Sequence, residues 1–180
     1  MEFGKWHDIE VEDDVTIYAE YPNGATGVFI TITGDYPGSN RLEITMDKAK
    51  LVCENGSKIT LYELAESLQE NIVNCESGFT SIDIKAIDVE TDGINDQHTG
   101  VLNAFADHIL FGTPLIANGD EGIRGLIISN AAHYSSWTGA TVELPIDEDK
   151  YYELLMKKVA SSKAKEDVVS VVNEDMSSTY

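Results

Sequence analysis

The chain has 180 residues, 42% of them hydrophobic, which suits one ordinary globular domain and excludes wholesale disorder. Its 12 basic and 32 acidic residues give a formal net charge of −20, so nucleic acid and anionic membranes are excluded as expected partners. No run of about 18 apolar residues occurs and no apolar leader opens the chain, so we expect a cytoplasmic protein without a membrane span.

The first half of the chain predicts antiparallel strands. Residues 15–21 and 28–33 alternate with period two, and Pro22-Asn23-Gly24 between them is typical of a hairpin turn. Residues 34–40 are rich in turn formers and predict a loop. Residues 41–46, 50–54 and 57–62 predict three more strands, which the short connections make antiparallel neighbours.

The next segment is ambiguous. Leu64, Leu68 and Ile72 have helical spacing, whereas the family resemblance described below favours extended structure for part of residues 64–77. Residues 81–89 predict another strand, in which the alternation slips at Ala86-Ile87 and indicates a bulge.

The second half predicts helices. Asp96 is placed to cap a helix over 97–111 that Gly112 ends, and a second helix runs from Gly119 to about residue 137 before Gly139. A short strand over 141–144 and a third helix over 147–160 follow. The expected inward side chains are Val101, Leu102, Phe105 and Ile109, then Ile123, Leu126, Ile127, Asn130, Tyr134 and Trp137, then Tyr152, Leu155, Met156 and Val159.

Strands followed by helices predict an α+β fold, an open and mostly antiparallel sheet with helices packed on one face. We expect this domain to span residues 1–160. Residues 161–180 predict an acidic, flexible tail, in which the valines at 168–172 leave a short strand or a binding segment as the alternative.

The usual catalytic and metal-binding patterns are absent from the sequence. Cys53 and Cys75 lie outside any C-x-x-C pair, so we expect buried, inert thiols. The histidines form no H-x-x-x-H pair, and no metal site is expected. We expect His108 to lie on the solvated flank of its helix. We expect His133 to be an interfacial histidine with its hydrogen bonds satisfied, at the edge of the inner face of its helix.

No dinucleotide cradle is predicted either. The nearest glycine pattern, Gly119-x-x-Gly122-x-x-Gly125, lacks G-x-G and a preceding strand. The adjacent carboxylates of Glu12 and Asp13 fall at the entrance to a strand, where alternation separates them, so they indicate a charged strand edge rather than an acid/base pair.

The order of several short motifs resembles the post-catalytic part of the Gfo/Idh/MocA (glucose–fructose oxidoreductase/inositol dehydrogenase) family. They cover roughly residues 3–160. The matching stretches are residues 8–15, 21–27, 40–44 with 50–51, 105–114, 122–131, 136–137 and 142–145. One departure is the Met46-Asp47-Lys48-Ala49 turn, where relatives tend to carry glycines, and another is the tail after about Ser161.

The resemblance implies an NAD- or NADP-dependent oxidoreductase whose N-terminal Rossmann domain holds the cofactor. The family's E-K-P lysine and D-x-x-x-H pair do not occur in this sequence, so we expect no catalytic residue and no cofactor bound by this chain. The family's C-terminal sheet closes the substrate pocket and makes subunit contacts. By that analogy the pocket candidates are Tyr36, Asn40, Arg41, His98, Trp6 and His7, although surface or packing roles would also suit them.

Two hypotheses follow. The first is the substrate-pocket and oligomerisation half of a truncated or split sugar or polyol oxidoreductase, silent on its own, with a homo-oligomer through the sheet face and a separately encoded Rossmann half as partners. The second is a stand-alone module that self-associates or binds a small polyhydroxy compound.

Overall fold

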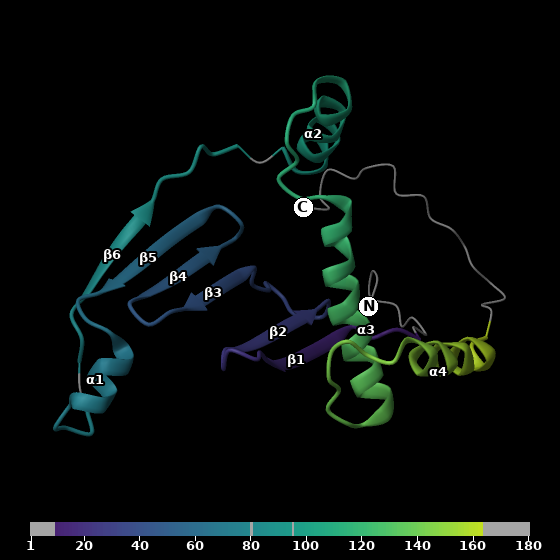
Figure 1. The fold of residues 1–180 in the computed structure, drawn as a ribbon, viewed down its shortest axis with the longest axis horizontal. Coiled ribbons are helices and arrows are strands. Elements are labelled where there is room, and N and C mark those ends of the chain that lie inside the picture. The colour runs from purple at the N-terminus through teal and green to yellow at the C-terminus, as the bar shows by residue number, and fades with distance from the viewer. Residues whose placement is uncertain (1–9, 80, 95, 164–180) are drawn as a thin grey trace. The chain divides into compact units, whose positions relative to one another are not determined.

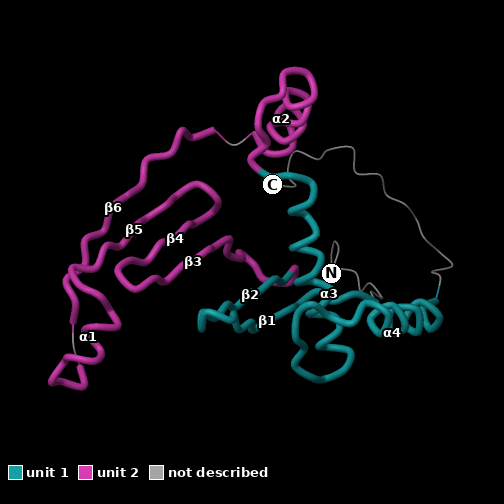
Figure 2. Tube along the Cα trace, viewed as in Figure 1, with its two compact units in different colours: residues 1–32, 117–180 teal, residues 33–116 magenta. Residues whose placement is uncertain are grey.

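The computed structural model describes residues 10–79, 81–94 and 96–163 (Figure 1). The chain divides into two compact units (Figure 2). The first contains the described residues within 1–32 and 117–180, and the second spans residues 33–116.

The first unit begins with a hairpin. Strands β1 (Asp14–Glu20) and β2 (Thr26–Ile32) pair antiparallel in continuous register. The turn is closed by the Tyr21 backbone N–H donating to the Ala25 carbonyl at 2.9 Å. Gly24 has a φ of +84°, a conformation that glycine adopts without steric cost. The Asn-Gly turn predicted from the sequence is therefore confirmed.

Helices complete the first unit. A 3₁₀ turn η1 (Gly119–Glu121) leads into α3 (Gly122–Thr138), and α4 (Glu148–Ser161) packs against α3. Gly139 ends α3 in the left-handed region, at a φ of +65°. Asp147 caps α4 by accepting a hydrogen bond from the Lys150 backbone N–H at 3.1 Å.

The second unit contains a four-stranded sheet in the order β3-β4-β5-β6. Its strands are β3 (Arg41–Thr45), β4 (Ala49–Glu54), β5 (Lys58–Leu64) and β6 (Ile84–Val89), and each pairs antiparallel with its neighbour. The short helix α1 (Leu68–Asn74) lies between β5 and β6, and α2 (Gln97–Phe111) follows the sheet.

The α+β class and the open antiparallel sheet are thus confirmed. The predicted helix over 97–111 is confirmed at both ends, with Gly112 at a φ of +71°, although Asp96 makes no side-chain capping bond. A layer of helices on one sheet face stays a prediction, as does a single domain over 1–160. The tail interpretation concerns residues that lie mostly outside the described part of the chain.

The ambiguity within 64–77 is resolved in favour of both alternatives: Leu64 ends β5, and Ser67 caps α1, which contains Leu68 and Ile72. Two local predictions are wrong. The bulge at Ala86-Ile87 is absent, because both residues pair in unbroken register with β5. Residues 141–144 form no strand, since no described strand lies alongside them to complete a ladder.

The predicted inward faces of the helices are only partly correct. The predicted inward residues of α2 are exposed, and even the least exposed of them, Phe105, has 54% of its surface accessible. The reason is that α2 makes no extensive contact with another described element. In α4, Tyr151 and Leu155 are half-buried while Tyr152 is 61% exposed, and Met156 and Val159 are also exposed. In α3, the half-buried residues all lie in the second half of the helix, and Ile123, Leu126 and Ile127 in the first half are exposed.

None of the described helices combines the length and the apolar character needed to cross a membrane.

Candidate functional site

The four-stranded sheet has two faces of different chemistry. Residues opposite each other in an antiparallel pair share a face, and successive residues alternate between faces. The charged face consists of Arg41, Glu43, Thr45, Lys50, Val52, Glu54, Lys58, Thr60, Tyr62, Leu64, Ile84, Ala86 and Asp88. The aliphatic face consists of Leu42, Ile44, Leu51, Cys53, Ile59, Leu61, Ile87 and Val89, with Ala49, Glu63 and Lys85 along its edge.

An ion-pair network crosses β3 and β4 on the charged face. Arg41 donates from Nε to Glu43 Oε1 at 2.6 Å and from Nη1 to Glu54 Oε1 at 2.7 Å. Lys50 pairs with the other oxygen of Glu43. Hydrogen bonds from Lys50 and then Arg41 lower the pKa of Glu43, and the bond to Glu43 raises the pKa of Arg41. The two basic and two acidic groups balance, so the network carries no net charge.

The floor of this face is the best-covered part of the sheet. Val52, in the centre of β4, is only 5% exposed, and Thr60 opposite it is 9% exposed. Thr60 donates from Oγ1 to Asp88 Oδ1 at 3.3 Å. The aliphatic stems of long neighbours such as Arg41 and Lys50 cover apolar surface while their charged ends stay in water.

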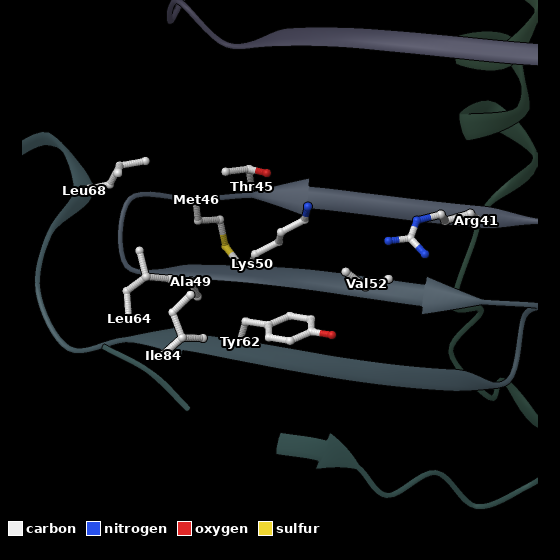
Figure 3. A pocket seen from close by; sticks show the side chains of 10 residues that line it. All are labelled: Arg41, Thr45, Met46, Ala49, Lys50, Val52, Tyr62, Leu64, Leu68 and Ile84. Atoms are coloured by element: carbon white, nitrogen blue, oxygen red, sulfur yellow. The ribbon is translucent and has the colours of Figure 1, made fainter. Parts of the chain in front are cut away.

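A hollow of about 380 Å³ lies over this face (Figure 3). Its lining residues are Arg41, Thr45, Met46, Ala49, Lys50, Val52, Tyr62, Leu64, Leu68 and Ile84. Figure 3 shows Met46, Leu64 and Ile84 gathered at one end, while Arg41 and the Tyr62 hydroxyl lie toward the other. The hollow therefore has an apolar end and a polar end.

The polar end can recognise hydroxyl groups. Arg41 and Lys50 supply donors, and the Tyr62 hydroxyl can both donate and accept. An apolar wall with a few convergent polar groups is the usual composition of a small-molecule site. Because Glu43 and Glu54 balance the charges of Arg41 and Lys50, this end offers no net charge to attract a strongly charged ligand.

The structure separates the pocket candidates predicted from the sequence. Arg41 lines the hollow, whereas Tyr36, Asn40 and His98 are not among its lining residues. Tyr36 is 95% exposed in the loop before β3, and the Asn40 carbonyl accepts a hydrogen bond from the Asn55 backbone N–H at 2.8 Å. His98 is exposed in the first turn of α2. Trp6 and His7 lie outside the described residues.

Sequence reasoning missed the other polar members of the hollow. Lys50 and Tyr62 lie inside strands, as does Glu43, which pairs with Lys50 without lining the hollow, whereas the predicted candidates lie in loops or at element ends. The available signal was the strand register. The short turn between β3 and β4 places the acid of Glu43 and the base of Lys50 on the same face.

The aliphatic face is incompletely covered. Leu42, Ile44 and Val89 are 40% exposed or more, and the other members are half-buried. The charged residues Glu63 and Lys85 lie at its edge and pair with each other at 3.8 Å. Cys53 on this face is a free, half-buried thiol, as is Cys75 at the end of α1. The face is therefore apolar and nearly neutral within a strongly acidic chain.

The first unit contains an aromatic cluster with a packing role. Trp137 of α3 stacks on Tyr151 of α4 at 5.6 Å and lies 5.3 Å from the His133 ring. His133 Nδ1 lies 3.4 Å from Glu12 Oε2, and Lys158 is positioned over the Trp137 ring. The predicted interfacial role of His133 is confirmed. His108, by contrast, is exposed, and its Nδ1 lies 2.8 Å from the Thr113 carbonyl.

The glycine-rich segment at the start of α3 differs from a dinucleotide-binding turn. Gly119, Gly122 and Gly125 run from η1 into the first turns of α3, and the described segment ahead of them is not a strand, so the usual strand–turn–helix pyrophosphate cradle is not formed there. Within the described ranges, no group of three or more His, Cys, Asp or Glu side chains could hold a metal ion. The sequence matches no family model, and no curated protein matches it.

Proposed function

We propose that this chain provides the substrate-pocket and subunit-contact domain of an NAD- or NADP-dependent sugar or polyol oxidoreductase of the Gfo/Idh/MocA type, and is not catalytic by itself. The ordered motif resemblance over residues 3–160 supports the family. A cytoplasmic location belongs to the same proposal. The cofactor and the proton-transfer residues would come from a nucleotide-binding domain, because this chain offers no cradle for pyrophosphate.

One observation carries the proposal: a single open sheet has a hollow with a polar end on one face and a nearly neutral aliphatic surface on the other. A pocket wall needs donors and acceptors placed over a firm floor, as Arg41, Lys50 and Tyr62 are over Val52. A subunit contact needs an apolar surface free of like charges, as the aliphatic face is.

The redox part of the proposal is tested in two arms. Calorimetric titration of the chain with NAD or NADP should give no binding heat, and a clear micromolar signal would refute the proposal. In the second arm, residues 10–163 replace the matching domain of a polyol dehydrogenase of the family. The chimera should reduce the cofactor with a polyol, and the same enzyme without any C-terminal domain is the control. A folded chimera that binds cofactor but reduces it with no polyol would count against the assignment.

The subunit contact should involve a second copy of this chain through the aliphatic face. Two chains that each carry a formal charge of −20 repel each other, so they can meet only where acidic groups are absent or neutralised. Glu63 and Lys85 neutralise each other at the edge of this face, and its centre is aliphatic. Sheet faces pack about 10 Å apart with interdigitated side chains, which an aliphatic face allows.

A matched pair of variants tests this contact. Ile44→Lys puts a cation on the aliphatic face, and Thr45→Lys puts the same cation on the charged face one residue along β3. Each change lowers the net negative charge by one, so general repulsion falls equally in both. Sedimentation velocity at high protein concentration should show association for the wild type and Thr45→Lys but not for Ile44→Lys. Equal association of both variants would exclude the aliphatic face.

A stand-alone module that binds a polyhydroxy compound is the second candidate, and the polar end of the hollow favours it. The discriminating measurement is NMR titration of the chain with inositol and glucose. Shifts of the β4 and β5 amides in the absence of any nucleotide-binding domain would favour the module. Shifts that appear only in the chimera would favour the oxidoreductase domain.

A further inference from the structure

A strap of chain crosses the end of the sheet between β5 and β6. We define the α1 strap as residues 65–74, which comprise three linking residues and α1. Ser67 caps the helix by accepting from the Glu70 backbone N–H at 3.1 Å. The strap itself buries little, since Ile72 and Val73 are largely exposed. A seven-residue helix is too short to be stable without tertiary contacts.

One residue of the β3–β4 turn supplies the contacts at the start of α1, while the Ala65 backbone N–H at the other end of the strap donates to the Asp83 carbonyl at 3.0 Å. Asp47 Oδ1 accepts hydrogen bonds from the Ser67 hydroxyl at 2.9 Å and from the Gln69 backbone N–H at 3.0 Å. The Asp47 backbone carbonyl also accepts from the Leu68 backbone N–H at 2.9 Å. Ser67 is 4% exposed, the lowest value among the described polar residues, so its bond to Asp47 is partly shielded from water, whereas the bond from Gln69 is exposed.

The same contact positions one end of the hollow. Leu68, the first residue of α1, lines the hollow together with Met46, the neighbour of Asp47 (Figure 3). Leu64 and Ile84 line this apolar end from β5 and β6. The position of the strap therefore sets how far the apolar end is closed.

We propose that Asp47 is a latch that holds the α1 strap against the sheet and thereby controls access to the apolar end of the hollow. Asp47 is a positioning residue, because it acts through Ser67, Gln69 and the Leu68 backbone rather than on a ligand. When the latch opens, α1 loses its anchors and Leu68 leaves the hollow, while the β-ladders stay intact. The inference depends on this geometry and holds whether or not the proposed function is correct.

The two natural cysteines report the opening separately. Cys75 follows the last turn of α1, where its backbone N–H donates to the Asn71 carbonyl at 2.8 Å, and Cys53 lies in β4. Both thiols are half-buried, so labelling by a thiol reagent follows local opening around each one. Asp47→Ala should accelerate labelling of Cys75 on the order of tenfold and leave Cys53 unchanged. Lys48→Ala, in the same turn, is the control and should label like the wild type.

Three results would overturn the proposal. Equal acceleration of both cysteines would show that Asp47 stabilises the whole unit, and hydrogen exchange of the β4 and β5 amides checks this independently. No acceleration of Cys75 would show that the strap does not depend on Asp47. Asp47→Asn keeps the side-chain acceptor and should label more slowly than Asp47→Ala. Equal labelling of these two variants would mean that the side-chain hydrogen bonds are not the latch.

Discussion

Individual charged residues on the sheet act through their strand neighbours. Glu43 accepts from Arg41 on its own strand and pairs with Lys50 on the next, so one carboxylate bridges two cations and Glu54 supplies the second negative charge. Asp47, four residues further along the chain, instead accepts from uncharged donors at the start of α1. Hydrogen bonds from Gln69 and then Ser67 lower the pKa of Asp47 more than the neighbouring Lys48 does, so hydrogen bonding is the main stabilisation of its ionised form.

Replacing Glu43 should flatten the acid dependence of stability. Because Lys50 and Arg41 lower the pKa of Glu43, its stabilising contribution is complete above the unfolded-state pKa of about 4.3 and is lost as the pH falls through the lower folded-state pKa. Urea unfolding between about pH 7 and pH 3 should therefore show a shallower loss of stability in Glu43→Gln than in the wild type. Glu20→Gln, outside this network, is the control, and an unchanged acid slope in Glu43→Gln would contradict the expectation.

Elements show how far local sequence determines structure. The helix ends at Gly112 and Gly139 were predictable because glycine alone takes the left-handed conformation without a steric penalty. Helix faces were harder to predict. Tyr151 and Tyr152 are adjacent in α4, and which of them packs depends on how α4 crosses α3. Tyr151 is the one that packs, because its ring stacks on Trp137 with an interplanar angle of 9°.

The α3–α4 contact predicts a difference between two neighbouring tyrosines. Tyr151 donates from its hydroxyl to Asn130 Oδ1 at 3.1 Å in a partly buried setting, whereas Tyr152 is 61% exposed. Tyr151→Phe keeps the stacking on Trp137 but leaves the Asn130 oxygen without this donor, and should cost about 1 kcal/mol of unfolding free energy. Tyr152→Phe should be nearly neutral. Thermal and urea unfolding of both variants provide the comparison, and equal costs would contradict the assigned contact.

At the scale of the whole molecule, the charge of −20 governs how copies of the chain meet. Exposed like charges repel over roughly the Debye length, which is about 10 Å at about 0.1 M salt and shortens as salt is added. An association through the aliphatic face should therefore strengthen with ionic strength, because salt screens the repulsion while apolar contact persists.

Sedimentation velocity measures this dependence directly. Raising sodium chloride from about 0.05 M to about 0.5 M should shift the wild type toward a larger species. Ile44→Lys should respond much less, since its aliphatic face carries a buried cation in any such contact. A contact held mainly by ion pairs would weaken with salt instead, and that result would contradict the aliphatic face as the interface.

Sequence reasoning recovered much of the fold and little of the site. The strands, most of the turns and the ends of α2 follow from local rules of alternation and glycine placement, because those depend on near neighbours in the chain. Of the four predicted pocket residues within the described ranges, Arg41 lines the hollow and Tyr36, Asn40 and His98 do not. Tyr36 and His98 were chosen for their loop positions, but a hollow on a sheet is built by strand register.

The sequence by itself therefore determined the α+β class, the antiparallel pairing and the absence of the usual dinucleotide motif. Each of these depends on residues that lie close together along the chain. Only the tertiary structure decided which residues share the charged face, that Tyr151 rather than Tyr152 contacts α3, and that Asp47 binds the start of α1. These depend on contacts between residues about 20 positions apart or on the register of paired strands. Periodicity along one segment cannot specify them, because the partner segment supplies the other half of the interaction.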